Sequence, residues 1–360
     1  MILKPVEDRE SRQRRFTAGS WSLAKCEGVR GGMLGAALLG LVTILAASEA
    51  RAVSCTTQAE LKPDERRSIL ETGNALAGDI SAQNFDGLQG SLMPAVISEW
   101  EGMKSVAQSA KPLIEGGKMD WGNAYLLDAT DLKGPADTQF FCTNADSSAT
   151  VTINLRSLPP GRYTLLLGDA AGAPLAGQLA FILGTDAAAA GKWKLGGIFV
   201  REGALDGHDG VWYWTQARKL ASSKAAWSAW YEYDAARWLL LPVDFLSSPH
   251  LEKLNREQQQ TGSNPAESLP ITVTGDGGKS WKVTGLRLDT ALHHDDLGLA
   301  YESTGPQMDP AAQRAEAIAV MSGLLKTHPE LRANFHGLWA YAERDGRRNY
   351  AVELAMQDIP

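Results

Sequence analysis

The chain has 360 residues, of which 44% are hydrophobic and 21% are charged, so it has enough apolar material for two or three folded domains. This composition excludes a largely disordered chain. The formal net charge of −7 excludes the basic surface that nucleic-acid binding requires, so we expect no nucleic-acid partner.

The first 52 residues are typical of a signal peptide whose amino-terminal region either is long and of mixed charge or truly begins near Val29. Residues 33–48 form an uncharged apolar run, which suits a signal-peptide core better than a membrane span of roughly twenty residues. Ala50, Arg51 and Ala52 give the small-x-small pattern of a cleavage site, so we expect cleavage after Ala52. The mature chain would then carry 27 basic and 37 acidic residues and no membrane span, and would be secreted or periplasmic.

Cleavage would leave two cysteines, Cys55 and Cys142. An even pair in an oxidising compartment predicts a disulfide, which would tie the mature N-terminus to a predicted strand at 136–144. The alternative is a lipoprotein anchored through an acylated Cys55 in the sequence Ala52-Val53-Ser54-Cys55, and this alternative would leave Cys142 unpaired.

We expect an α+β domain over residues 53–205. Apolar residues at three-and-four spacing predict two helices between about 64 and 111. Six short apolar runs then follow, each bounded by Gly, Pro, Asp or Asn, and they predict an antiparallel meander of six strands: 121–129, 136–144, 149–155, 161–168, 177–184 and 192–200.

Two helices followed by a meander that ends on the Trp-Lys strand at 191–200 resemble the NTF2-like superfamily over residues 64–202. The resemblance implies an NTF2/cystatin-like fold with a cone-shaped pocket, which serves enzymes in some members and dimerisation in others. No acid and base in this region match a catalytic member, so the resemblance carries no residue role to this chain.

Residues 206–254 contain a tryptophan-rich helical hairpin followed by the start of a short helix. Five of the eleven tryptophans lie between 211 and 242. We expect helices over 209–222 and 225–241, with Asp209 capping the first. The spacing of six residues and a closing proline resembles one tetratricopeptide repeat over residues 209–242: Tyr213, Ala217, Leu220, Ala229, Tyr233, Ala236 and Pro242.

The second helix of this hairpin has two faces when residues are placed 100° apart. Its small-residue face should pack against the first helix. The aromatic stripe on the other face has two readings: it is interdomain core, or it is an open surface that binds an unknown protein or a small apolar ligand. The binding residues on the second reading are Trp227, Trp230, Tyr231, Asp234 and Trp238.

A polar stretch with Gly, Asn and Pro predicts a linker at 255–268, and a second α+β domain follows at 269–360. The predicted order is β-β-β-α-β-β, with the helix at 309–326 and the last two strands joined at Asp345-Gly346. Thr274, Asp276, Gly278, Ser280 and Trp281 resemble the Asp-box hairpin of sialidases and other secreted β-proteins over residues 274–281. That resemblance implies a stabilised turn rather than a sialidase.

The run His293-His294-Asp295-Asp296 is the only cluster of metal-type ligands in the sequence. Adjacent strand residues point to opposite faces, so at most one His and one Asp of the run would share a site unless the run turns. His336 would be a further ligand. One reading is therefore a divalent metal such as zinc held by His293, Asp295 and His336, and the other is a solvated acidic loop.

No nucleophile elbow, HExxH pair, CxxC pair or dinucleotide-binding glycine pattern occurs, so we predict no catalytic residue. We expect a non-catalytic binding or scaffold protein that uses the aromatic hairpin surface and needs no cofactor. The alternative function is a metal-dependent hydrolase with its site around His293, Asp295 and His336.

Overall fold

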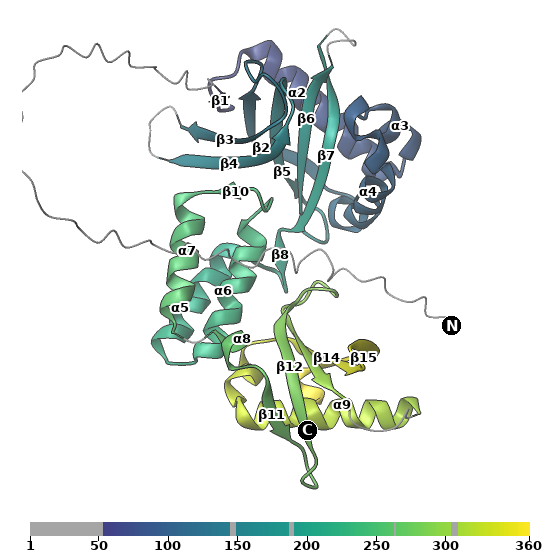
Figure 1. Cartoon of the computed structure of the whole chain (residues 1–360), viewed down its shortest axis with the longest axis vertical. Coiled ribbons are helices and arrows are strands. Elements are labelled where there is room, and N and C mark those ends of the chain that lie inside the picture. Colours follow the sequence, from purple (N-terminus) through teal and green to yellow (C-terminus); the bar gives the residue numbers. More distant parts are fainter. Residues whose placement is uncertain (1–52, 145–148, 187–190, 263, 304–308) are drawn as a thin grey trace, which may run out of the picture. The chain divides into compact units, whose positions relative to one another are not determined.

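The computed structural model describes residues 53–144, 149–186, 191–262, 264–303 and 309–360 (Figure 1). Helices and mainly antiparallel sheets occur together in this part, which confirms the α+β class. The predicted signal peptide and its cleavage site lie outside the described residues. Within the described residues, no helix is both long enough and apolar enough to span a membrane.

The described part of the chain begins with a short strand, β1 (Ser54–Thr56), and continues with a helical region. The four segments are α2 (Pro63–Ala82), α3 (Phe85–Gly90), the 3-10 helix η1 (Pro94–Glu99) and α4 (Trp100–Ile114). Pro63 starts α2, where a missing N–H costs nothing, and Gln83 ends it in the left-handed conformation. Asn84 then caps α3 by accepting the Gly87 N–H at 3.2 Å.

The six strands expected between 121 and 200 are present, but they do not form one meander. They are β2 (Lys118–Asp128), β3 (Ala136–Thr143), β4 (Thr150–Leu158), β5 (Arg162–Ala171), β6 (Gly177–Asp186) and β7 (Lys192–Glu202). One sheet has the order β1-β2-β5-β6-β7, and β3 and β4 belong to a second sheet (Figure 1). The expected single meander is therefore wrong, because β2 pairs directly with β5.

The two sheets separate because the first has an apolar surface on both faces. Residues 163–166 of β5 are all buried. On β2, Ala124 and Leu126 face the core under the helices, whereas Tyr125 and Leu127 face the core shared with β3 and β4. A strand that is apolar on both faces needs a cover on each. The helices supply one cover, and the β3–β4 hairpin supplies the other.

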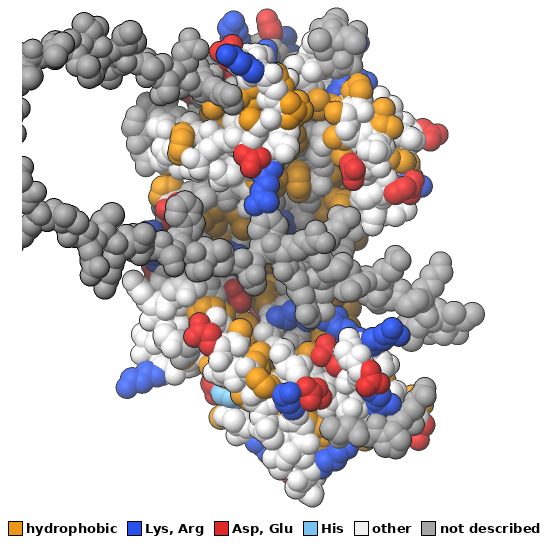
Figure 2. Space-filling model, in the orientation of Figure 1, with side chains coloured by type: hydrophobic (Ala, Val, Ile, Leu, Met, Phe, Trp, Pro, Cys, Tyr) orange, Lys and Arg blue, Asp and Glu red, His pale blue; other side chains and the backbone are white. Residues whose placement is uncertain are grey.

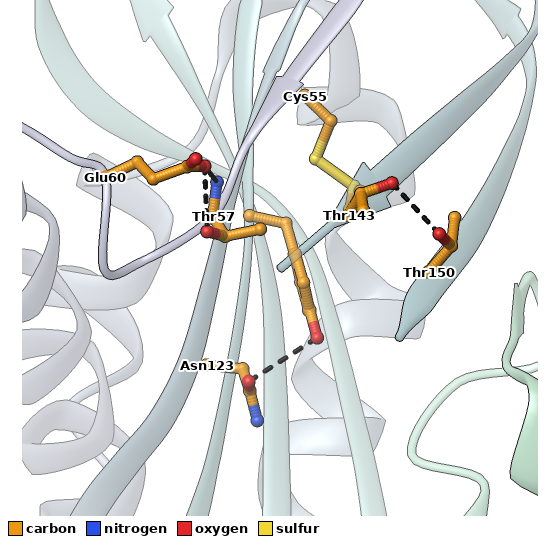
Figure 3. The surroundings of a disulfide bond; sticks show 8 residues. Cys55, Thr57, Glu60, Asn123, Thr143 and Thr150 are labelled. Carbon is orange, nitrogen blue, oxygen red and sulfur yellow. Dashed lines mark hydrogen bonds between the residues drawn. A yellow bond between two sulfur atoms is a disulfide. The ribbon is translucent and has the colours of Figure 1, made fainter. Parts of the chain in front are cut away.

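A disulfide joins the short first strand, β1 (Ser54–Thr56), to the second sheet. Cys55 on β1 is bonded to Cys142 on β3, across 87 residues of sequence. Figure 3 shows hydrogen bonds on both sides of it: Thr57 donates to the Glu60 carboxylate at 2.9 Å, and the hydroxyls of Thr143 and Thr150 pair at 2.9 Å. The bond therefore links an ordered turn to an ordered hairpin.

The tryptophan-rich segment forms two helices between short strands. Its elements are β8 (Ala204–Leu205), β9 (His208–Asp209), α5 (Gly210–Ser222), α6 (Ala226–Leu240), β10 (Leu246–Ser247), α7 (Pro249–Gln260) and α8 (Pro265–Ser268). Asp209 caps α5 by accepting the Trp212 N–H at 2.8 Å. Strand β10 pairs with β4, so this segment also extends the second sheet. The linker expected at 255–268 is largely helical.

The C-terminal part is one five-stranded sheet with a helix on one face. Its elements are β11 (Ile271–Thr274), β12 (Ser280–Asp289), β13 (Asp296–Glu302), α9 (Pro310–Thr327), η3 (Pro329–Ala333), β14 (Gly337–Arg344), β15 (Arg347–Ala355) and η4 (Met356–Asp358). The strands follow one another in sequence order, and only β13 and β14 run parallel. The crossover through α9 makes that parallel pairing possible.

The disulfide should contribute substantially to stability, because it closes a long loop. We expect the double substitution Cys55→Ala/Cys142→Ala to lower the free energy of unfolding by about 3 to 5 kcal/mol. Urea denaturation of the mature chain measures this change. Reduced wild type is the matched control and should show a similar loss. Equal stability of the oxidised wild type and the double variant would contradict the prediction.

Candidate metal centre

Strand topology brings three metal-type ligands to one edge of the C-terminal sheet. Asp296 begins β13, and His336 directly precedes β14. Because β13 and β14 are parallel, with Leu297 opposite Leu338, these starting residues meet at the same edge. Strand β15 runs antiparallel to β14 and places Glu353 opposite Trp339, so its second half returns to that edge.

Asp296, His336 and Glu353 form a cluster with the geometry of a metal site. One ligand atom from each residue lies within 4.8 Å of the other two. The Asp296 side chain is 0% exposed and the His336 side chain is 37% exposed, so the cluster reaches from the interior to the surface. Such a set contains one imidazole nitrogen and two carboxylate oxygens, which are ligands that zinc and related ions accept.

Neighbouring groups fix the orientation of the Asp296 carboxylate. Its Oδ1 lies 2.9 Å from Nδ1 of His336, and its Oδ2 accepts a hydrogen bond from Nε1 of Trp339 at 3.2 Å. An indole N–H of this kind is the outer-shell contact that holds a ligating carboxylate in place.

Gly337 leaves room for the ligand oxygens. A Cβ at this position would lie 2.8 Å from Oδ1 of Asp296, 2.9 Å from Oε1 of Glu353 and 2.8 Å from the backbone carbonyl oxygen of Leu354. All three contacts are closer than real Cβ atoms make. The absence of a side chain beside His336 therefore lets two carboxylates approach each other, and that approach is electrostatically unfavourable unless a cation or a proton lies between them.

Burial raises the pKa of Glu353, and the nearby Asp296 carboxylate raises it further. The His336 and His294 imidazoles act in the opposite direction. A bound cation would replace the proton that this crowding favours.

His294 stacks on the imidazole of His336. The two ring centroids are 3.8 Å apart and the planes are inclined by 11°. The Nδ1 atom of His294 is hydrogen-bonded to Oδ1 of Asp206. The nitrogen lone pairs of stacked imidazoles lie in parallel planes, so His294 does not point at an ion that His336 binds.

Asp206 reaches this loop from outside the C-terminal sheet. It lies in the two-residue turn between β8 and β9, where both Asp206 and Gly207 have positive φ, as tight hairpin turns require. Its Oδ2 also accepts the backbone N–H of Asp295 at 2.9 Å. Burial alone would raise the pKa of Asp206, but the hydrogen bonds from His294 and Asp295 outweigh burial and lower it.

Asp295 is buried next to the candidate ligands. Its Oδ1 accepts the backbone N–H of His336 at 3.1 Å. Burial raises its pKa, and the adjacent Asp206 carboxylate raises it further. Asp206 and Asp295 therefore share a proton more readily than they carry two charges.

Glu232 on α6 is a third acidic side chain in this region, near enough to Asp295 for the charge of Asp295 to act on it. It is 3% exposed, and its Oε2 has no hydrogen-bond partner among the described residues. Burial, together with the charge of Asp295, raises the pKa of Glu232 to about 9. At neutral pH the side chain is therefore protonated.

The structure brings together some, but not all, of the residues that the sequence indicated as metal ligands. His336 lies in the cluster. Asp295 does not, and its side chain accepts a hydrogen bond from the backbone N–H of His336. His293 points elsewhere: it has a φ of 63°, and its Nδ1 lies 3.6 Å from Oε1 of Glu202. The run does turn, and Asp296 rather than Asp295 lies in the cluster.

Sequence reasoning missed Glu353 and Asp206 entirely. Glu353 is one of several polar residues on an apparently regular strand. Asp206 lies in a short connection between two predicted domains. The only sequence signal for Asp206 was its Asp-Gly pair, which is typical of a tight turn.

The aromatic stripe of α6 is covered by the C-terminal part. Tyr231 is 2% exposed, belongs to the core of the C-terminal sheet and donates its hydroxyl to the Leu286 carbonyl at 3.1 Å. Trp227 stacks on His328 with centroids 3.6 Å apart, and Trp230 packs against the same core. These three side chains therefore form an internal contact rather than an open groove.

The remaining two residues of the stripe, Asp234 and Trp238, also contact other side chains of the same chain. Asp234 accepts a hydrogen bond from Gln258 at 2.8 Å and lies 3.8 Å from Arg237. Trp238 donates to the Glu202 carboxylate at 2.8 Å, and its ring lies under the guanidinium of Arg201. The structure thus favours the interdomain-core reading of the stripe.

Acidic and basic side chains lie among one another on the face drawn in Figure 2. Comparisons with protein-family models, with characterised proteins and with solved structures find no match.

The protonated Glu232 predicts a specific pH dependence. Its folded pKa of about 9 lies above its usual value of 4.5, so the folded state holds a proton that the unfolded state loses. Stability should therefore fall as the pH rises through this window. Glutamine carries no titratable proton, so Glu232→Gln should lack the fall in unfolding free energy that Glu232 causes as the pH rises. We expect this variant to be more stable than wild type by about 2 kcal/mol or more at pH 8, with a smaller difference at pH 5.

Urea denaturation at the two pH values measures this difference. Glu252→Gln is the matched control, because Glu252 is exposed on α7 and pairs with Arg256. It should change stability little at either pH. A difference between Glu232→Gln and wild type that does not grow with pH would contradict the prediction.

Proposed function

We propose that this protein binds a divalent transition-metal ion of the zinc class at Asp296, His336 and Glu353. The observation that carries the proposal is that three ligand atoms from three separate strand ends lie within 4.8 Å of one another. Gly337 supports it, because a side chain at that position would occupy the space in which the two carboxylates meet.

The ligand chemistry favours a transition metal over calcium or magnesium. An imidazole nitrogen suits zinc and its neighbours, whereas calcium and magnesium take oxygen ligands. Three protein ligands would leave at least one coordination position for water or another ligand, and His336 is partly exposed, so an ion bound there would be reachable from solvent. An open position of this kind suits reversible binding of an ion.

The alternative function, a metal-dependent hydrolase, remains a second candidate on one observation. Three protein ligands with an open position are also the arrangement in which a metal ion activates water. Binding is the better-supported function, because the acidic groups beside the cluster, Asp295 and Glu232, are buried rather than open to a substrate. The aromatic stripe receives no support as a ligand surface, because its residues are engaged within the chain.

We also propose that the protein acts outside the cytoplasm. The support is the disulfide between Cys55 and Cys142, because such bonds persist in oxidising compartments. The same bond leaves Cys55 without a free thiol, which favours a secreted or periplasmic chain over a lipid-anchored one.

Metal binding predicts a measurable stabilisation. Mature protein stripped with a chelator should bind about one equivalent of Zn²⁺ in titration calorimetry. It should also gain about 2.7 kcal/mol of stability when free Zn²⁺ is a hundred times its Kd. We expect His336→Ala to weaken binding by at least tenfold, because it removes the only nitrogen ligand of the cluster.

His250→Ala is the matched control for this experiment. His250 is an exposed histidine on α7 and has no place in the cluster. The control should bind Zn²⁺ as the wild type does. Absence of near-stoichiometric uptake by the wild type would refute the proposed function, and equal losses in the two variants would place the ion elsewhere.

A further inference from the structure

We infer that occupancy of the metal centre is coupled to the contact between the β8–β9 turn and the loop at 290–296, with Asp206 and His294 as positioning residues. The inference rests on the proposed function and deepens it. Neither positioning residue belongs to the ligand cluster. Both act through His336, which is held by contacts that begin at Asp206.

His336 is fixed at three points. Asp296 contacts its Nδ1 at 2.9 Å, Asp295 accepts its backbone N–H at 3.1 Å, and the His294 ring stacks on its ring at 3.8 Å. A ligand imidazole that is fixed before the ion arrives loses less rotational freedom when it binds.

Two of these three points depend on one carboxylate. Asp206 is bonded through Oδ1 to the His294 ring and accepts the Asp295 N–H through Oδ2. It therefore fixes the stacking ring and, at the same time, the residue that holds the His336 backbone. Loss of Asp206 would release both contacts while leaving the three ligands in the sequence.

Asp206 comes from a different part of the chain than the ligands. It is separated from His294 by 88 residues and lies at the tip of a hairpin that leads directly into α5. The ligand geometry therefore forms fully only while the β8–β9 turn contacts the loop. By thermodynamic reciprocity, an ion that prefers the complete geometry must also strengthen that contact.

The test uses the mature chain with Zn²⁺ and Co²⁺ as probes. We expect Asp206→Ala to keep a stoichiometry of one ion and to bind Zn²⁺ about tenfold more weakly, the usual effect of losing an outer-shell partner. The visible absorption of bound Co²⁺ should change, since it reports coordination geometry. His294→Phe keeps a flat ring but loses the bond to Asp206, so it should weaken binding in the same direction and should not add fully to Asp206→Ala.

Amide hydrogen exchange supplies a readout away from the ligands. Zn²⁺ should slow exchange in the peptide covering residues 204–209 of the wild type, although none of those residues is a ligand. This protection should be absent in Asp206→Ala. Asp244→Ala is the matched control, because Asp244 is an exposed carboxylate that pairs with Arg201. It should match the wild type in both measurements.

The outcomes separate this inference from the proposed function. A wild type that binds no ion overturns both. A wild type that binds one ion, with no protection at 204–209 and with unchanged affinity in Asp206→Ala and His294→Phe, overturns the coupling alone. Weaker Zn²⁺ binding by the two variants, with a Co²⁺ spectrum and an exchange pattern like those of the wild type, also overturns the coupling. A general loss of stability would be enough to explain that weaker binding.

Discussion

The parallel pairing of β13 with β14 is the constraint on which the candidate site depends. In an antiparallel pair, residues that precede the two strands lie at opposite ends, whereas the crossover through α9 brings Asp296 and His336 to the same edge. The apolar residues of β13 and β14 that pack under α9 hold this pairing in register, among them Leu299, Leu338 and Ala340. The core of the sheet therefore determines the separation of the ligands.

The same edge concentrates acidic side chains that the fold must accommodate. Asp296 is stabilised by hydrogen bonds from its neighbours, and Asp206 by two donors. Asp295 and Glu232 are accommodated differently, because burial favours their protonated forms. Protonation avoids the much larger free-energy cost of burying unpaired charge. A cation at the edge would offset the remaining repulsion between Asp296 and Glu353.

The sequence predicted local structure better than it predicted pairing. Periodicity located the long helices and the long strands, but not the short strands β1, β8, β9 and β10. It also could not show that β2 pairs with β5, because that contact skips two strands. Glu353 was missed for a related reason. A bulge between Ala342 and Glu343 shifts the pairing of β14 with β15 by one residue. Without that bulge Glu353 would face the core side of the sheet, since a one-residue slip inverts every side chain. His336 was found because histidine is rare and the run at 293–296 is unusual.

The covered aromatic stripe gives the hairpin a different role from that of a binding surface. Tyr231 and Trp227 attach α6 to the C-terminal part through the β12 and η3 regions. Glu232, their neighbour on α6, is buried within electrostatic reach of Asp295. The turn that precedes α5 places Asp206 against His294. Apolar packing supplies most of the free energy of such a contact, and the polar groups determine which residues face one another across it. Tyr231 and Trp227 therefore act on the candidate site indirectly, because they attach the helical hairpin beside the histidine loop.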